Sequence, residues 1–207
     1  ATTANAGEVF AAFKSKQYEL GVKMEHGQVM TGVSVFQIDR PNAITDQATN
    51  IYSMDGTQRN RGLELSAVGE AVRNLRLMAS ATIYDATLKR SAGAVNQGKD
   101  AIGVPKYTLN LGADWDVPGV HGLSVNARAI HTAATPYDVA NTLDMPSWTR
   151  VDAGARYRTT IMGKPVALRA SVENLFNRNY WLSSSTLLTV STAAAARTLL
   201  LSAQFDL

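Results

Sequence analysis

The chain has 207 residues, of which 45% are hydrophobic, yet its mean hydropathy is only -0.09. Apolar and polar residues must be finely mixed, and no stretch approaches the roughly 18 to 20 consecutive apolar residues of a membrane-spanning helix. The formal net charge is +3 and the pI is near 9.2, but the lysines and arginines are scattered singly, so we expect no nucleic-acid partner.

The chain contains no cysteine, which suits a reducing cytosol or an exported protein that avoids stray disulfides. Its opening segment, ATTANAGEVF, has no basic segment, no apolar signal core and no initiating Met. We therefore expect that a signal was removed or that the chain was cut from something longer.

Alternation of apolar and polar residues with a period of two dominates the chain. Every second residue is apolar in QYELGVKM (17–24), and YTLNLGADWD (107–116) repeats the pattern. Helical periodicity is nearly absent. The sequence therefore predicts an all-β protein of about nine strands, over 17–24, 28–39, 57–70, 73–89, 107–116, 123–129, 151–158, 164–175 and 197–207.

The connections between these strands alternate between short and long. The short ones are expected at Glu25–Gln28, Glu70–Asn74, Val117–Gly122 and Ile161–Lys164. The long ones are expected at Arg40–Gly56, Arg90–Val104, Ala134–Ser147 and Asn177–Ala196. Greek-key crossings have no reason to follow this rule. An antiparallel up-and-down transmembrane β-barrel does, because its periplasmic turns are tight and its external loops are long.

The two faces of the strands fit the same interpretation. In an outer-membrane barrel the apolar face contacts lipid and the polar face lines a hydrated or plugged lumen. Aromatic residues stand near strand ends, as interfacial girdles require: Tyr107 and Trp115 on one strand, Trp148 and Tyr157 on another. We expect the charged residues on the polar parity to form a lumen wall, consisting of Glu19, Glu64, Asp114, Arg128, Asp152, Arg156, Arg169 and Glu173.

The sequence shows no sign of catalytic or metal chemistry. His26 and His121 fall in expected periplasmic turns, whereas His131 lies near the opposite end of a strand, so these three cannot share one metal ion. There is no G-x-S-x-G elbow, no P-loop and no H-E-x-x-H motif. We expect no enzyme, no catalytic residue and no bound metal.

One C-terminal segment, SVENLFNRNYW (171–181), resembles the N-L-F-[ND]-x-x-Y signature of TonB-dependent outer-membrane receptors, with the ferric-siderophore branch as the nearest match. Further family-like segments occur upstream in the order that this family shows. They are KSKQYELGVK, VFQIDRPNAI, QRNRGLELSAVGE, GVPKYTLNLGADWDVP and SWTRVDAGARYR. The resemblance covers essentially the whole chain.

The resemblance implies a 22-strand barrel closed around an N-terminal plug, in the outer membrane of a Gram-negative bacterium. Residues 1–207 would be its C-terminal nine strands or so, without the plug and the segment that engages TonB. It implies uptake of a ferric siderophore, energised by the TonB complex through the plug, with lipid around the barrel and no cofactor of the protein's own. The wall charges would then touch the plug. Leu207 departs from the family, whose barrels usually end in an aromatic residue.

For ligand capture, this family uses aromatic and basic side chains on external loops and at the inner mouth. The resemblance therefore nominates Tyr52, Tyr84, Tyr137, Trp148, Tyr180 and Trp181, with Arg128 and Arg150 as donors. Asn174, Asn177 and Asn179 are expected where a strand leaves the membrane, because asparagine tolerates left-handed backbone and caps free backbone groups.

Three alternatives stay open at this point. The chelate bound could be cobalamin, haem or another metal complex. The chain could be a small self-contained porin-like barrel, which an even count of complete strands would favour. It could also be a soluble β-sandwich. Replacing Leu109 or Leu168 with arginine would distinguish the sandwich from a membrane barrel. A barrel should lose assembly in lipid because the charge faces the hydrocarbon, whereas a sandwich should lose solubility in plain buffer.

Overall fold

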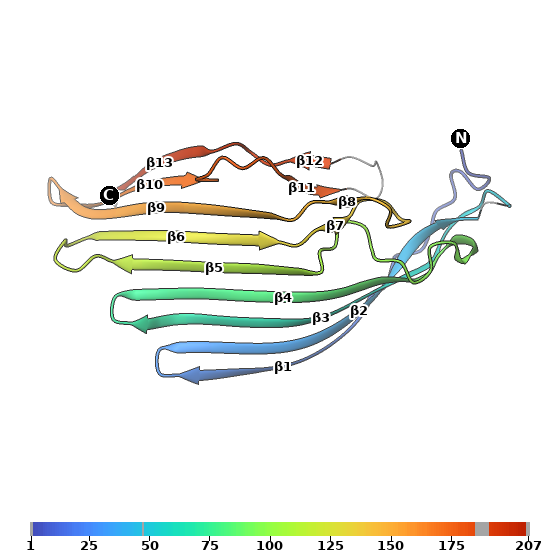
Figure 1. The fold of residues 1–207 in the computed structure, drawn as a ribbon, viewed down its shortest axis with the longest axis horizontal. Helices are drawn as coiled ribbons and strands as arrows, with labels where there is room; N and C mark the ends of the chain where they lie inside the picture. The colour runs from blue at the N-terminus through green and yellow to red at the C-terminus, as the bar shows by residue number, and fades with distance from the viewer. Residues whose placement is uncertain (1, 47, 185–190, 206–207) are drawn as a thin grey trace.

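The computed structural model describes residues 2–46, 48–184 and 191–205. Nine strands form one antiparallel sheet in which chain neighbours are also sheet neighbours (Figure 1). This meander confirms the predicted all-β, up-and-down architecture. Its strands are β1 (Lys16–His26), β2 (Val29–Thr45), β3 (Tyr52–Val72), β4 (Leu75–Arg90), β5 (Tyr107–Asp116), β6 (Leu123–Thr132), β9 (Trp148–Ile161), β10 (Lys164–Glu173) and β13 (Thr198–Phe205).

The remaining elements are small and lie in the long connections. The pair β7 (Thr135–Pro136) and β8 (Asp144–Met145) and the pair β11 (Trp181–Ser184) and β12 (Ser191–Ala193) each form a two-stranded ribbon. A single 3-10 turn, η1, spans Ala92–Ala94. Within the described residues, no helix has the length and apolar content needed to span a membrane.

Short and long connections gather at opposite ends of the sheet (Figure 1). The hairpins 27–28, 73–74, 117–122 and 162–163 share one end, and the connections 91–106, 133–147 and 174–197 share the other. The two-residue hairpin at 162–163 places both Met162 and Gly163 at positive φ, 51° and 76°, which matches the twist of the flanking strands. The expected alternation is therefore confirmed at these seven connections.

The expected long connection over Arg40–Gly56 is wrong. β2 and β3 continue to pair as far as Thr45 and Tyr52, leaving only residues 46–51 as a loop, with an irregularity between Asn42 and Ile44. The alternation fades here because polar and apolar residues mix on both faces of this extension, but backbone pairing does not need an apolar face. The bidentate ion pair between Asp39 and Arg59, at 2.6 and 2.8 Å, helps to hold the two strands together.

Register places the apolar parity of every strand on one face of the sheet. That face is strongly exposed: Leu20 by 74%, Leu111 by 59% and Leu201 by 72%. Outward-facing aromatics flank it, with Tyr18 and Tyr107 toward the loop end and Trp115, Tyr157 and Phe205 toward the hairpin end. This is the pattern of a lipid-facing band between two interfacial girdles. Trp148 does not belong to a girdle, because it has the opposite parity to Tyr157 on β9.

The soluble sandwich is excluded by the layer structure. No second sheet covers the apolar face in the described residues, and no side chain there is less than 2% exposed. A small closed barrel is not formed either, since β1 and β13 do not pair with each other. Leu207, the family's expected aromatic position, lies outside the described residues.

Exposure of the apolar face to lipid leads to a paired prediction on β5. Leu111→Arg puts a charge near the centre of that face and should cost about 2 to 4 kcal/mol of folding free energy in a bilayer. Asn110→Arg, one residue away on the polar face, should be tolerated. The measurement is urea unfolding of the protein encoded by the native gene, refolded into lipid vesicles. Equal losses for both variants would contradict the assignment of the faces.

Candidate functional site

The connection from β10 to β13 is anchored by Asn174, which is only 2% exposed. Its side-chain amide donates to the carbonyls of Arg178 and Ala195, at 2.9 and 3.0 Å, and its Oδ1 accepts from the Arg178 N–H at 2.9 Å. Its own N–H donates to Asp152 on β9. One asparagine therefore joins β9, the turn after β10 and the segment that leads into β13.

Asn177 supports the same turn. Both asparagines have left-handed backbone, with φ of 53° at Asn174 and 50° at Asn177, and Asn177 Oδ1 accepts from the Arg197 N–H at 2.9 Å. The structure confirms the turn-and-cap role expected for these two residues. Asn179, by contrast, is exposed and lines the cavity described next.

The anchored turn carries Tyr180 onto Trp148, the first residue of β9. Their rings stack with centroids 4.3 Å apart and planes inclined by 23°. Arg150, the next residue of β9 on the same face, forms an ion pair with Asp152 at 2.8 Å and also interacts with the Tyr180 side chain. The carboxylate of Asp152 thus accepts hydrogen bonds from both the Arg150 guanidinium and the Asn174 N–H, and it links β9 to the loop that follows β10.

A cavity of about 610 Å³ opens beside this stack at the loop end of the sheet. The aromatic rings supply flat apolar walls, and Arg178 and Asn179 supply hydrogen-bond donors. Small residues from β12 and the segment after it leave room on the far side. The lining consists of Pro146, Ser147, Trp148, Thr149, Arg178, Asn179, Tyr180, Trp181, Ala193 and Ala194.

Two neighbouring loops are tied to each other at the same end of the sheet. The Asn141 side chain accepts from the Asp100 N–H at 2.7 Å and donates to the Asp100 carbonyl at 3.1 Å. Within 133–147, the backbone N–H of Leu143 and the Thr142 hydroxyl and N–H hold the pKa of Asp138 below its ordinary value. Hydrogen bonds therefore join the connections 91–106 and 133–147 at the loop end of the sheet.

The structure brings together only some of the nominated ligand residues. Trp148, Tyr180 and Trp181 line the cavity, and Arg150 lies just below it. Tyr52 packs instead on Phe10, with ring centroids 5.5 Å apart.

The other nominated residues lie away from the cavity. Tyr84 is on the polar face of β4 against Phe36, 6.3 Å between centroids. Tyr137 is in the loop after β7, and Arg128 is midway along β6. Sequence reasoning missed Arg178, although its position between the asparagine motif and Tyr180 was a usable signal.

The charged residues expected on the lumen wall all share the polar face by register. Arg128 on β6 pairs directly with Asp152 on β9, and Arg156 and Arg169 stand directly opposite each other on β9 and β10. Glu64 lies across from Ser34, and Glu19 from Phe36. Whether these side chains meet a plug stays a prediction.

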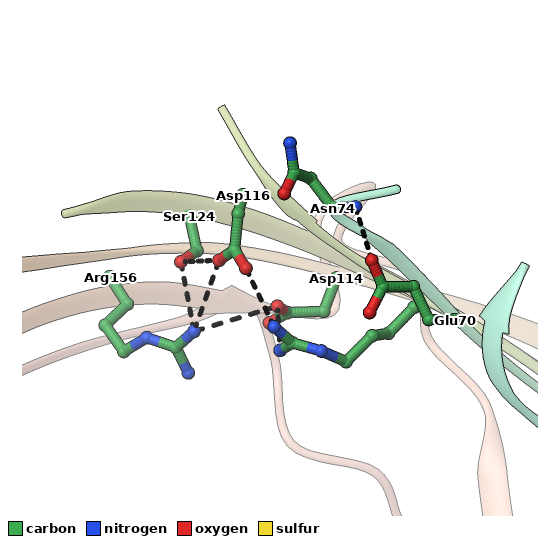
Figure 2. Close-up of polar contacts among 7 residues, drawn as sticks. Glu70, Asn74, Asp114, Asp116, Ser124 and Arg156 are labelled. Carbon is green, nitrogen blue, oxygen red and sulfur yellow. Dashed lines mark hydrogen bonds and ion pairs between the residues drawn. The ribbon is translucent and has the colours of Figure 1, made fainter. Parts of the chain in front are cut away.

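Near the hairpin end, part of this wall is an internally neutral network (Figure 2). Arg76 contacts Asp116 at 2.7 Å and Asp114 at 3.4 Å. Arg156 donates to the Ser124 hydroxyl at 3.0 Å, and that hydroxyl donates to Asp116 at 2.6 Å. The network crosses β4, β5, β6 and β9, so its ion pairs and hydrogen bonds join four strands of the wall.

Comparison with known proteins places the chain in a receptor family. The family model "TonB dependent receptor-like, beta-barrel" matches residues 1–175. The ferrichrome receptor FcuA of Yersinia enterocolitica is 40% identical over 179 residues, which is 86% of this chain and 24% of that protein. The ferrichrome outer membrane transporter/phage receptor of Escherichia coli K12 is 33% identical over 184 residues, covering 84% of this chain and 24% of its own length.

Solved structures agree. The ferric preacinetobactin receptor BauA from Acinetobacter baumannii superimposes with a TM-score of 0.86 at 35% identity, over 100% of this chain and 31% of that structure. The chain spans about a quarter of the length of the curated relatives that it matches. With the nine-stranded meander, the lipid-facing band and the asparagine-anchored loop, these matches show that the chain belongs to the TonB-dependent receptor-like β-barrel family.

Proposed function

We propose that this chain forms part of the wall and external mouth of a receptor that takes up a ferric siderophore, with energy supplied through TonB. The family consists of outer-membrane transport receptors rather than enzymes. Two relatives are named for ferrichrome, and the BauA structure is named for ferric preacinetobactin. The iron is cargo, and the protein needs no cofactor or catalytic group of its own.

The observation that carries this proposal is the Trp148–Tyr180 stack beside a cavity of about 610 Å³ at the external mouth. Cavities of roughly 300 to 1,000 Å³ with aromatic walls and a few convergent donors suit compact small-molecule ligands. Arg178 and Arg150 add guanidinium groups, which can hydrogen-bond the oxygen atoms of a chelate. The lumen-facing charges would contact a plug that closes the barrel.

Removing either ring of the stack should weaken ligand binding. Trp148→Ala and Tyr180→Ala each delete an aromatic anchor worth about 2 kcal/mol, so we expect roughly thirtyfold weaker binding. Trp115→Ala, on the lipid-facing girdle, is the matched control and should bind normally. The measurement is binding of ⁵⁵Fe-labelled hydroxamate and catecholate chelates to iron-starved cells that express the native gene, with cobalamin as a non-ferric competitor.

Unchanged affinity in both ring variants would remove the cavity from the binding site. Failure of the unmodified protein to bind any ferric chelate, or preferential binding of cobalamin, would contradict the proposed function itself.

The Asn174 anchor should be needed for the same affinity without touching the ligand. Asn174→Ala leaves the Arg178 N–H and two carbonyls without partners, and it places alanine in left-handed backbone. We expect a loss of about 1 to 3 kcal/mol in the stability of this loop, and weaker chelate binding because Tyr180 is no longer held.

Two variants separate the causes at this position. Asn174→Gly keeps the backbone conformation but loses the anchor, so it should resemble Asn174→Ala. Phe176→Ala alters a 67% exposed side chain of the same turn and should behave as the unmodified protein. Protease sensitivity of the loop in intact cells reports the disorder directly. A stable loop in Asn174→Gly would show that backbone strain, and not the side-chain bonds, explains the alanine result.

A further inference from the structure

A second cavity, of about 660 Å³, opens at the hairpin end of the sheet, far from the aromatic stack, and is here called the rim cavity. The hairpins 73–74 and 117–122 and the end of β9 around Arg158 line it. Asn74, Asp116 and Ser124, which Figure 2 shows, belong to the same lining. None of the residues proposed to hold a chelate takes part in it.

The rim cavity carries positive charge that the protein does not neutralise. Arg73, His121 and Arg158 line it and are exposed, and none of their side chains makes a hydrogen bond or an ion pair with any residue that the structure describes. The carboxylate of Asp116 also lines the cavity, but Arg76 contacts it at 2.7 Å and the Ser124 hydroxyl donates to it at 2.6 Å. The cavity therefore presents two unpaired guanidinium groups and an imidazole, while its carboxylate is already engaged.

The turn 117–122 adds backbone donors to these side chains. The N–H groups of Gly119, His121 and Gly122 donate to no acceptor among the described residues. Gly119 and Gly122 both have positive φ, 82° and 83°, which lets the turn fold back tightly on itself. Backbone N–H groups brought together in such turns form concavities that bind anions. Side chains and backbone thus both favour an anion in the rim cavity.

The rim cavity also joins the polar face of the sheet to the lipid-facing one. Short hairpins of outer-membrane barrels face the periplasm, and aromatic residues mark the depth of the lipid headgroups. Two girdle residues are adjacent: Trp115 precedes Val117 by two residues, and Tyr157 is the cross-strand partner of Leu123. Val117 and Leu123 line the cavity with lipid-facing parity, whereas Arg158 has the polar parity. The lining is therefore amphipathic and lies at the headgroup depth of the periplasmic leaflet.

We propose that the rim cavity binds the phosphate group of an anionic phospholipid from the periplasmic leaflet, with the acyl chains on the lipid-facing side of β5 and β6. Guanidinium groups bind phosphate oxygens through paired, planar hydrogen bonds. Basic residues at the membrane surface attract anionic lipids. A free phosphate would use the same donors but would leave Val117 and Leu123 without a partner, so the apolar part of the lining favours a lipid. This site is separate from chelate capture and does not depend on it.

The test measures lipid binding to the full-length receptor encoded by the native gene. Arg73→Gln, Arg158→Gln and the double variant are compared with the unmodified protein. Lys164→Gln is the matched control, because Lys164 begins the strand after the next hairpin and does not line the rim cavity. Native mass spectrometry of the detergent-solubilised protein counts bound molecules in titrations with phosphatidylglycerol, with diacylglycerol of the same chains and with glycerol 3-phosphate.

Folding of each variant is checked in parallel by heat-modifiable migration on gels. A double variant with Arg73→Lys and Arg158→Lys keeps both charges and gives a second measurement if the glutamine variants fold poorly.

We expect the unmodified protein to bind phosphatidylglycerol more tightly than either of the other two compounds. Each single glutamine variant should weaken phosphatidylglycerol binding about fivefold and the double variant about thirtyfold, because the contributions of the two charges multiply. The Lys164→Gln control and the double lysine variant should stay within about twofold of the unmodified protein.

Three results would overturn the proposal. The first is unchanged phosphatidylglycerol binding in the double glutamine variant, or an equal loss in Lys164→Gln. The second is diacylglycerol binding as tight as that of phosphatidylglycerol, which would mean that the acyl chains alone account for the affinity. The third is glycerol 3-phosphate binding as tight as that of phosphatidylglycerol, which would assign the rim cavity to a soluble phosphate instead of a lipid.

Discussion

The structure depends on one constraint: in hydrocarbon, every backbone N–H and C=O of a strand must be paired within the sheet. Continuous antiparallel pairing from β1 to β13 meets this demand for each interior strand. Once pairing fixes the register, the period of two assigns every side chain either to lipid or to the polar face. A conventional core is then unnecessary, and only six apolar residues are buried in the described part of the chain, of which three are the alanines Ala86, Ala101 and Ala133.

The same register assembles the charged groups of the wall. Arg76, Asp114 and Arg156 are far apart in the chain, yet each lies on the polar parity of its strand near the hairpin end. In this network the ion pairs therefore form between strands, and Ser124 completes the network from a buried position, 3% exposed. A slip by one residue in any of these strands would move its charges into lipid. The polar network and the lipid-facing band thus enforce the same register.

Sequence reasoning predicted what depends on local alternation and could not predict what depends on pairing between distant residues. The alternation in 107–116 was enough to locate β5 and to separate Leu111 from Asn110. It was not enough for 40–56, where polar and apolar residues mix without a period of two although the strands continue to pair.

The cavity at the loop end of the sheet also depends on contacts between distant residues that the sequence alone does not predict. The sequence indicated Trp148 and Tyr180 separately, but only the anchored turn brings their rings into contact. The sequence pattern suggested that Trp148 belongs to an aromatic girdle, because the alternation weakens at the start of β9 and the face on which Trp148 lies was not evident. The hydrogen bonds between Asn141 and Asp100 join two loops, and nothing in the sequence of either loop indicates that the two are in contact.

The cavity draws its lining from three parts of the chain: the residues around the start of β9, the turn after β10, and β12 with the residue that follows it. No one of these parts forms the cavity alone, because Asn174 joins the turn both to Asp152 on β9 and to the carbonyl of Ala195, and this turn places Tyr180 on Trp148. Under the proposed function, the wall would supply the flat aromatic surface and the guanidinium donors, and the asparagine anchor would hold them in place.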